Sequence, residues 1–510
     1  MYATKYEVQV SDDAENWTTA AVKDDGSGGT ETLSLENQTG RYVRLLLKET
    51  DPDNLAYIVK EFEVYGTNDL NYTGEVDELP APEEDGTQVL SGGNWKIARA
   101  LEVDPVTDTE ASAEDDSDAA DEIGKAMASA DYDDAAWLPA IVPGTVLTSY
   151  KSAGAVADPN YADQQFCISD SYFKSNFWYR NHFIIPQENS GKRVFINFGA
   201  INWKAEVYFN GRRLGNIRGG FTRAQFELTD YVNYGGENYL AVLIYKNTDP
   251  GTAHISTDSG PGTMGGVFGN SGEIGLDAPT YSAALGWDWV PTVRDRAIGI
   301  YNEVSLTYTQ DVQVVDPWMI TEFERDAEGG YDLTKAKLNL KTEVGNPSDG
   351  DVTAVETGTI EEAPEIRFEK EVQIPAGSAV EVDLGEVEFE DPEVWWPNTY
   401  GDQPLYTAVV SASVGGAVSD TSEFRFGVRE FDYYLDESDI TDRNGFNNGE
   451  NLALYCNGVK IICKGGNWGL EDQDLNVDAE KYDEKIRMHK DLNFNMIRLW
   501  GGQTNDPELY

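Results

Sequence analysis

The sequence is poor in several features, and each scarcity excludes a class of protein. There are 3 cysteines and 3 histidines among 510 residues. So few cysteines, in odd number, do not make a disulfide framework, and no two histidines stand at metal-ligand spacing. No apolar run reaches the ~18 residues that a membrane-spanning helix needs. We therefore expect free thiols, no metal, no cofactor and no membrane span.

Basic residues are scarce as well. There are 38 Lys and Arg against 91 Asp and Glu, which gives a net charge of −53. Nucleic acids and anionic membranes are bound through Lys/Arg patches, so this charge excludes both as partners. It favours solubility or adaptation to salt, although it would also attract cationic ligands such as amino sugars.

Aromatic residues and glycine are abundant, with 12 Trp, 27 Tyr, 19 Phe and 49 Gly. Short alternating segments predict a mainly β chain. Asn210-Gly211 and Asn457-Gly458 each predict a two-residue hairpin, and the second keeps Cys456 out of disulfide reach of Cys463. We expect the thiols to be packed as small apolar groups. Residues 102–134 form an acidic insertion that we expect to be a mobile loop or a short exposed helix.

Five segments follow one another along the chain. We predict half of a jelly roll at 1–66, a polar linker at 67–88, a jelly-roll sandwich at 89–310, an immunoglobulin-like β-sandwich at 311–429, and the start of a parallel (β/α)₈ barrel at 430–510. The last segment reads as a strand ending in KGGNWG, a helix over 479–492 and a strand NMIRLW. A complete barrel takes ~250 residues, so we expect it to be begun and not completed here.

The segment LGWDWVPTVRDRAIGI carries the sharpest signal for ligand recognition. In a strand, Trp287 and Trp289 share one face and Asp288 takes the other. Sugars pack apolar faces on aromatic rings and donate hydroxyls to carboxylates, each such bond contributing about 1.5–3 kcal/mol. The alternative is a core tryptophan pair with Asp288 bound to Arg294 or Arg296.

Several segments in order resemble glycoside hydrolase family 2, in the branch that holds β-mannosidases and exo-β-D-glucosaminidases. They are FWYRNHFIIP at 177–186, INFGAINWKAEVYFNGRRLG at 196–215, GWDW at 286–289, VWWPNTYGDQPLY at 394–406, FGVRE at 426–430, and NGVKIICKGGNWG with HKDLNFNMIRLWGG at the end. The resemblance implies that Trp287 and Asp288 belong to a sugar subsite.

The same resemblance assigns roles at the start of the barrel. Arg498 is expected to position the nucleophile carboxylate and Trp500 to line the sugar subsite, while Asn467 and Trp468 either line it or pack the loop. The alternative for Arg498 is a structural arginine buried against a carboxylate. The family uses two glutamates about 5–5.5 Å apart, on barrel strands four and seven, so we assign no catalytic residue to this chain.

The N-terminal strings KYEVQVSDDAENWT, GRYVRLLL and KEFEVYG resemble the second half of a discoidin (coagulation factor 5/8 type C) carbohydrate-binding module. We expect a fragment, inactive by itself, of a retaining β-glycosidase acting on terminal β-mannosides or β-glucosaminides of oligosaccharides. The alternative is a non-catalytic carbohydrate-binding or adhesive protein. The resemblance implies an extracellular or periplasmic location, although no signal-peptide core follows Met1. The oligomeric state stays open.

Overall fold

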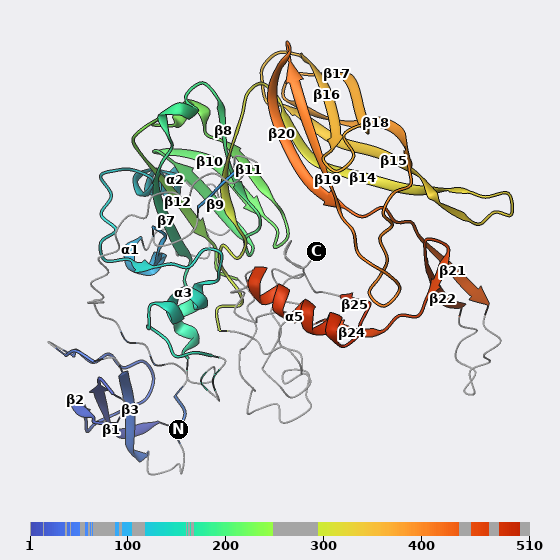
Figure 1. Cartoon of the computed structure of the whole chain (residues 1–510). Helices are drawn as coiled ribbons and strands as arrows, with labels where there is room; N and C mark the ends of the chain where they lie inside the picture. The colour runs from blue at the N-terminus through green and yellow to red at the C-terminus, as the bar shows by residue number, and fades with distance from the viewer. Residues whose placement is uncertain are drawn as a thin grey trace.

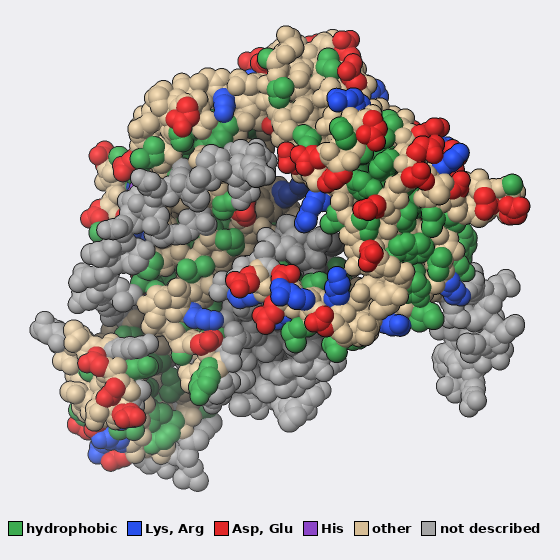
Figure 2. All heavy atoms as spheres, viewed as in Figure 1, with side chains coloured by type: hydrophobic (Ala, Val, Ile, Leu, Met, Phe, Trp, Pro, Cys, Tyr) green, Lys and Arg blue, Asp and Glu red, His purple; other side chains and the backbone are tan. Residues whose placement is uncertain are grey.

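The computed structural model is mainly β, as predicted, with its strands in several separate sheets (Figure 1). It describes residues 2–13, 15–35, 38–40, 42–50, 57–59, 62, 64, 87–90, 94–104, 118–159, 161, 164, 168–247, 294–437, 450–468 and 479–499. On the face shown in Figure 2, acidic side chains are spread over several of the domains. Among the described residues, no helix is long and apolar enough to cross a membrane.

The N-terminal segment forms one antiparallel sheet in the order β2-β1-β3. Its strands are β1 (Ala3–Ser11), β2 (Thr18–Lys23) and β3 (Tyr42–Thr50). Alternation along β1 buries Tyr6, Val8 and Val10. The strings YEVQVS and RYVRLLLKE predict strands that match β1 and β3, whereas β2 was not predicted. A third predicted strand, at 58–66, falls mostly outside the described residues.

Two sheets face each other in the jelly-roll domain. One has the order β10-β9-β12-β7-β5-β6 and the other the order β11-β8-β13-β4. Large apolar side chains such as Trp95, Phe183 and Phe198 fill the core between them. The elements are β4 (Gln88–Val89), β5 (Lys96–Arg99), β6 (Leu138–Pro139), α3 (Val146–Ser152), β7 (Phe177–Ile184), β8 (Arg193–Phe198), β9 (Lys204–Phe209), β10 (Arg212–Arg218), β11 (Ala224–Glu227), β12 (Glu237–Ile244) and β13 (Val304–Thr309), with short 3-10 turns at Asp170–Phe173, Gln187–Asn189 and Thr229–Tyr231.

The β9–β10 hairpin turns at Asn210 (φ 44°) and Gly211 (φ 75°), as the Asn-Gly pair predicts. The linker predicted at 67–88 lies outside the described residues up to 86, and β4 already includes its last residue, Gln88.

The acidic insertion is not a mobile loop or an exposed helix where the structure describes it, and that expectation was wrong. The helices α1 (Ala100–Val103) and α2 (Asp118–Met127) lie over the outer face of the six-stranded sheet, where Met127 and Ala128 are buried together with Trp178. Gly124 lets α2 approach closely, because a Cβ there would come within 2.3 Å of the Tyr208 ring. The close approach therefore requires a residue without a side chain at position 124.

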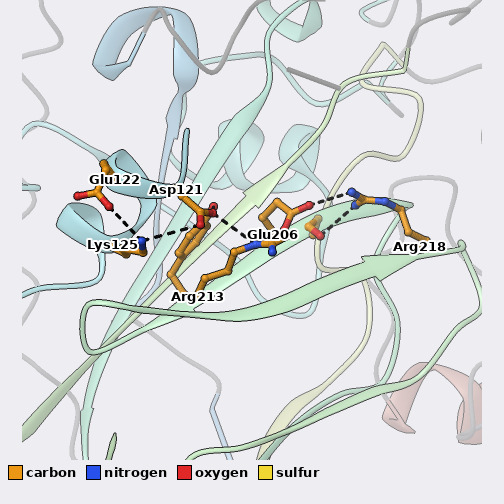
Figure 3. Close-up of polar contacts among 8 residues, drawn as sticks. Asp121, Glu122, Lys125, Glu206, Arg213 and Arg218 are labelled. Carbon is orange, nitrogen blue, oxygen red and sulfur yellow. Dashed lines mark hydrogen bonds and ion pairs between the residues drawn. The ribbon is translucent and has the colours of Figure 1, made fainter. Parts of the chain in front are cut away.

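Charged residues hold α2 on the sheet (Figure 3). Glu206 on β9 is almost fully buried and accepts from Arg213 at 2.7 Å and from Arg218 at 2.8 Å. Arg213 also lies 3.4 Å from Asp121 of α2, which pairs in turn with Lys125 at 3.9 Å. Each charge in the network therefore has an opposite charge beside it.

The next domain is a two-sheet β-sandwich with strand orders β14-β15-β18 and β17-β16-β19-β20. Strict alternation along β15 and β16 sends Leu338, Leu340, Ala354 and Ile360 into the shared core. The strands are β14 (Gln313–Arg325), β15 (Tyr331–Asn346), β16 (Val352–Ile360), β17 (Arg367–Ile374), β18 (Ser378–Glu390), β19 (Tyr406–Val414) and β20 (Ala417–Phe426).

The C-terminal segment begins with an antiparallel sheet of β21 (Phe431–Glu437), β22 (Glu450–Cys456) and β23 (Val459–Ile461). Asn457 and Gly458 form the predicted hairpin turn, which pairs Cys456 with Val459. Both Cys456 and Cys463 are free, as predicted. Cys463 is exposed, so it is not packed as a small apolar group.

The βαβ unit predicted at the end of the chain is present. Strands β24 (Gly465–Trp468) and β25 (Met496–Leu499) pair in parallel, and α5 (Ala479–Asp491) connects them. The helix ends one residue before the predicted end. A parallel pair joined by a helix is the repeating unit of a (β/α)₈ barrel.

Candidate functional site

The parallel register of β24 and β25 brings two predicted site residues together. Asn467 stands opposite Arg498, and neighbouring residues in register share one face of a sheet. Arg498 Nη1 donates to Asn467 Oδ1 at 2.9 Å. Both side chains are exposed. The pair therefore presents a guanidinium and an amide on one accessible face.

Trp468 takes the opposite face of β24. Its side chain is only 7% exposed, and its ring lies 6.3 Å from Tyr482 and 5.2 Å from His489 of α5. This favours the packing alternative for Trp468 over sugar binding. The adjacent Asn467 points away from α5, since successive residues of a strand alternate.

The environment of Arg498 bears on the choice between its two expected roles. A structural arginine would be buried against a carboxylate, whereas Arg498 is exposed and bonds an amide within the described part of the chain. Within the described residues its other N–H groups have no hydrogen-bond partner, and a guanidinium can form a two-point contact with a carboxylate. Guanidinium and carboxamide groups serve as hydrogen-bond donors and acceptors and not as general acids or bases, so the pair can bind and orient a ligand.

The other predicted site residues, Trp287, Asp288 and Trp500, lie outside the described residues. The structure does describe the chain from Arg294 onward, shortly after Trp287 and Asp288. Asp295 is fully buried and accepts from the backbone N–H of Leu147 at 2.6 Å and of Ala297 at 2.8 Å. Burial raises the pKa of Asp295. Its carboxylate thereby joins the first turn of α3 to the segment that follows the Trp-Asp-Trp motif.

A second anchor holds the same segment. The Asn202 side chain donates to the carbonyls of Arg296 and Ala297, each at 3.1 Å. Both acceptor residues have positive φ, 54° and 58°, a conformation that an L-residue adopts only where its surroundings fix it. Sequence reasoning missed Asp295 and Asn202. Their partners are distant in sequence, so no local pattern distinguishes these two residues from other short polar ones.

No group of three or more His, Cys, Asp or Glu within the described ranges is arranged to hold a metal ion. Two features of the described residues bear on function: the Asn467–Arg498 pair and the buried anchor at residues 295–297, which follow the Trp-Asp-Trp motif in the chain.

Comparison with known families assigns the domains. The domain described as "Glycosyl hydrolase 2 galactose-binding domain-like" matches residues 122–302, and "Glycosyl hydrolases family 2" matches residues 312–429. A third, "NedA-like, galactose-binding domain", matches residues 1–45.

Curated relatives agree with this assignment. The mannosylglycoprotein endo-β-mannosidase of Lilium longiflorum is 32% identical over 391 residues, which cover 74% of this chain and 38% of the relative. The exo-β-D-glucosaminidase of Streptomyces avermitilis is 28% identical over 386 residues, which cover 74% and 37%. The chain thus spans less than two fifths of the length of these two relatives.

Solved structures share the fold. The exo-chitosanase of Amycolatopsis orientalis matches with a TM-score of 0.62 and 21% identity, covering 83% of this chain and 42% of that one. The β-D-mannosidase of Dictyoglomus thermophilum matches with a TM-score of 0.58 and 20% identity, covering 83% and 45%.

Proposed function

We propose that this chain, which belongs to glycosyl hydrolase family 2, is part of a retaining β-glycosidase that releases terminal β-linked mannose or glucosamine from oligosaccharides. Two observations support the proposal. The relatives named above act on β-mannosides or β-glucosaminides by their names, and they match about three quarters of the chain. The described residues include a parallel βαβ unit of the barrel type.

The Asn467–Arg498 pair carries the proposal at the level of residues. It stands near the carboxyl ends of two parallel strands, which is where barrel enzymes place their active sites. In our proposal Arg498 holds the carboxylate nucleophile and Asn467 fixes the guanidinium. The nucleophile and the acid/base are two glutamates on barrel strands outside residues 1–510, about 5–5.5 Å apart as retention requires.

The remaining site residues complete the proposed sugar subsite. Asp288 accepts hydrogen bonds from sugar hydroxyls, and Trp287 and Trp500 form its aromatic walls. Trp468 is given no place in the subsite, since it packs on α5. Action on oligosaccharides outside the cytoplasm, in the medium or the periplasm, is part of the same proposal.

A substrate panel tests the proposal. The 510-residue chain and a protein extended through a complete barrel are assayed with aryl β-mannoside, β-glucosaminide, β-galactoside and β-glucuronide. We expect the extended protein alone to hydrolyse one of the first two, with the β-anomer released first in a proton NMR time course. Hydrolysis by the 510-residue chain would refute the placement of the glutamates. Sugar binding by an extended protein that hydrolyses none of the four would support the carbohydrate-binding alternative.

A substitution tests the subsite. Asp288→Ala in the active, extended protein should lower kcat/KM at least tenfold, which is about 1.4 kcal/mol of transition-state stabilisation. The thermal midpoint should not change. Asp349→Ala, at an exposed turn of the sandwich, is the matched control. A kcat/KM equal to that of the control would refute sugar binding by Asp288 and favour the structural alternative.

A further inference from the structure

A segment of the sandwich reaches across to the βαβ unit. Asn398 Nδ2 donates to the carbonyl oxygens of Lys490 at 3.0 Å and Phe494 at 2.8 Å. Two residues on, the Tyr400 hydroxyl accepts from the backbone N–H of Ile462 at 2.8 Å. We call residues 398–400 the clamp. It contacts the chain just before β24 and also the turn that leads from α5 into β25.

The first contact completes the end of a helix. The last carbonyls of a helix have no partners within it and must find them elsewhere. After α5, Asn493 adopts a positive φ of 61°, its N–H reaches Lys490 O at 2.9 Å, and the N–H of Phe494 reaches His489 O at 3.0 Å. This is a Schellman ending. The Asn398 side chain donates to Lys490 O, which also accepts from the N–H of Asn493, and to Phe494 O.

The clamp is linked to the candidate site through Asn495. The side chain of Asn495 accepts from the N–H of Lys464 at 2.8 Å and donates to the carbonyl of Ile462 at 3.1 Å. It thus ties the start of β25 to the start of β24. Since both strands run on from there in fixed register, this tie places Asn467 opposite Arg498 three residues later.

The backbone of the clamp is itself strained. Thr399 has a φ of 73°, a conformation that is unfavourable for a β-branched residue. Its side chain is exposed, so the conformation does not serve packing of Thr399. Thr399 lies between Asn398 and Tyr400, whose side chains both form hydrogen bonds with the βαβ unit and the chain leading into it. Strained residues of this kind persist where the surrounding structure holds them in place, and they gather at functional sites.

We propose that Asn398 and Tyr400 are positioning residues, through which the sandwich domain sets the register of β24 and β25 and so the orientation of Arg498. The effect on turnover rests on the function proposed above; the effect on the βαβ unit does not. Other contacts also join the sandwich to the C-terminal segment. Arg325 binds Glu430 at 2.5 Å and Asn457 Nδ2 donates to Trp395 O at 3.0 Å, and these contacts hold β21 and the β22–β23 turn to the sandwich.

Hydrogen exchange on the 510-residue chain tests the clamp without any assay of activity. Asn398→Ala should accelerate exchange of the amides in β25 and at Lys464 about tenfold, while the strands of the sandwich stay protected. Tyr400→Phe should act mainly at Ile462. Gln373→Ala, on an exposed position of β17, is the control. Protection of β25 equal to that of the control would overturn the proposal.

Kinetics of the extended protein test the route to Arg498. Asn398→Ala and Asn398→Asp, which keeps the shape but loses the donor, should each lower kcat about tenfold and change KM less than twofold. In an Arg498→Lys background, Asn398→Ala should add no further loss, because its effect acts through Arg498. Fully additive losses would refute a positioning role. A lack of hydrolysis by the unmodified extended protein would refute the proposed function instead, and the exchange experiment would still decide on the clamp.

Discussion

Glu356 on β16 is a buried acid for which the described part of the chain provides no ion-pair or hydrogen-bond partner. Its side chain has no exposed surface, and neither carboxylate oxygen has a hydrogen-bond partner among the described residues. Register places Ala412 between Glu356 and Asp420 on one face of the sheet. Lys370 is also opposite Glu356, but its Nζ donates to Asp383 O at 2.5 Å. Burial, and then the charge of Asp420, raise the pKa of Glu356 from 4.5 to about 7.

The sign and size of the effect on stability follow from that pKa. In the unfolded chain Glu356 ionises near pH 4.5, whereas in the folded chain it keeps its proton up to about pH 7. Between these values the folded state binds the additional proton, so this contribution is complete below pH 4.5 and is lost as pH rises to 7. The difference, 7 − 4.5 = 2.5 pH units, corresponds to about 3 kcal/mol at 1.36 kcal/mol per unit.

Glu356→Gln should remove this loss, because a neutral amide of the same shape does not ionise. The thermal midpoint of the sandwich is measured by calorimetry from pH 4.5 to 8.5, with Glu371→Gln as the control at an exposed position of β17. We expect the variant to unfold at about the wild-type temperature at pH 4.5 and ~10 °C higher at pH 8, since about 1 kcal/mol shifts the midpoint of a domain of this size by ~4 °C. A difference that does not change with pH would refute the reasoning.

Other predictions test packing, thiols and charge. Gly124→Ala should destabilise the jelly-roll domain by about 1–3 kcal/mol, because the added methyl group would collide with Tyr208. Faster tryptic cleavage at Lys125 would report this loss of stability. The control Gly350→Ala, at a position with open space around it, should leave the cleavage rate unchanged. At pH 8 a thiol reagent should modify Cys463 at least a hundredfold faster than Cys456, which is buried and whose pKa burial raises to about 11; equal rates by mass spectrometry would contradict this. With a net charge of −53, the thermal midpoint should rise by several degrees between 0.1 and 1 M NaCl, as screening relieves self-repulsion; a falling midpoint would show that ion pairs such as Glu206–Arg213 dominate.

Local patterns were enough to predict the elements whose signals lie within a few residues. The alternation along β15 and β18, the two Asn-Gly turns and the helix between β24 and β25 all depend on neighbours in sequence. The acidic insertion was misjudged because its helix is stabilised by residues far away in the chain. Tyr208 of β9 and Arg213 of β10, both far along the chain, contact it in the folded domain.

In the candidate site too, some features could be predicted from the sequence and others could not. The sequence determined which residue types stand at the ends of β24 and β25, and its motifs indicated the family. Only the tertiary structure decided that Asn467 joins Arg498, that Trp468 turns to α5, and that Asn398 of another domain holds the turn before β25. The physical reason is that hydrophobic periodicity reports which face of an element is buried, whereas the partner of a polar side chain is set by contacts between distant segments and leaves no periodic trace.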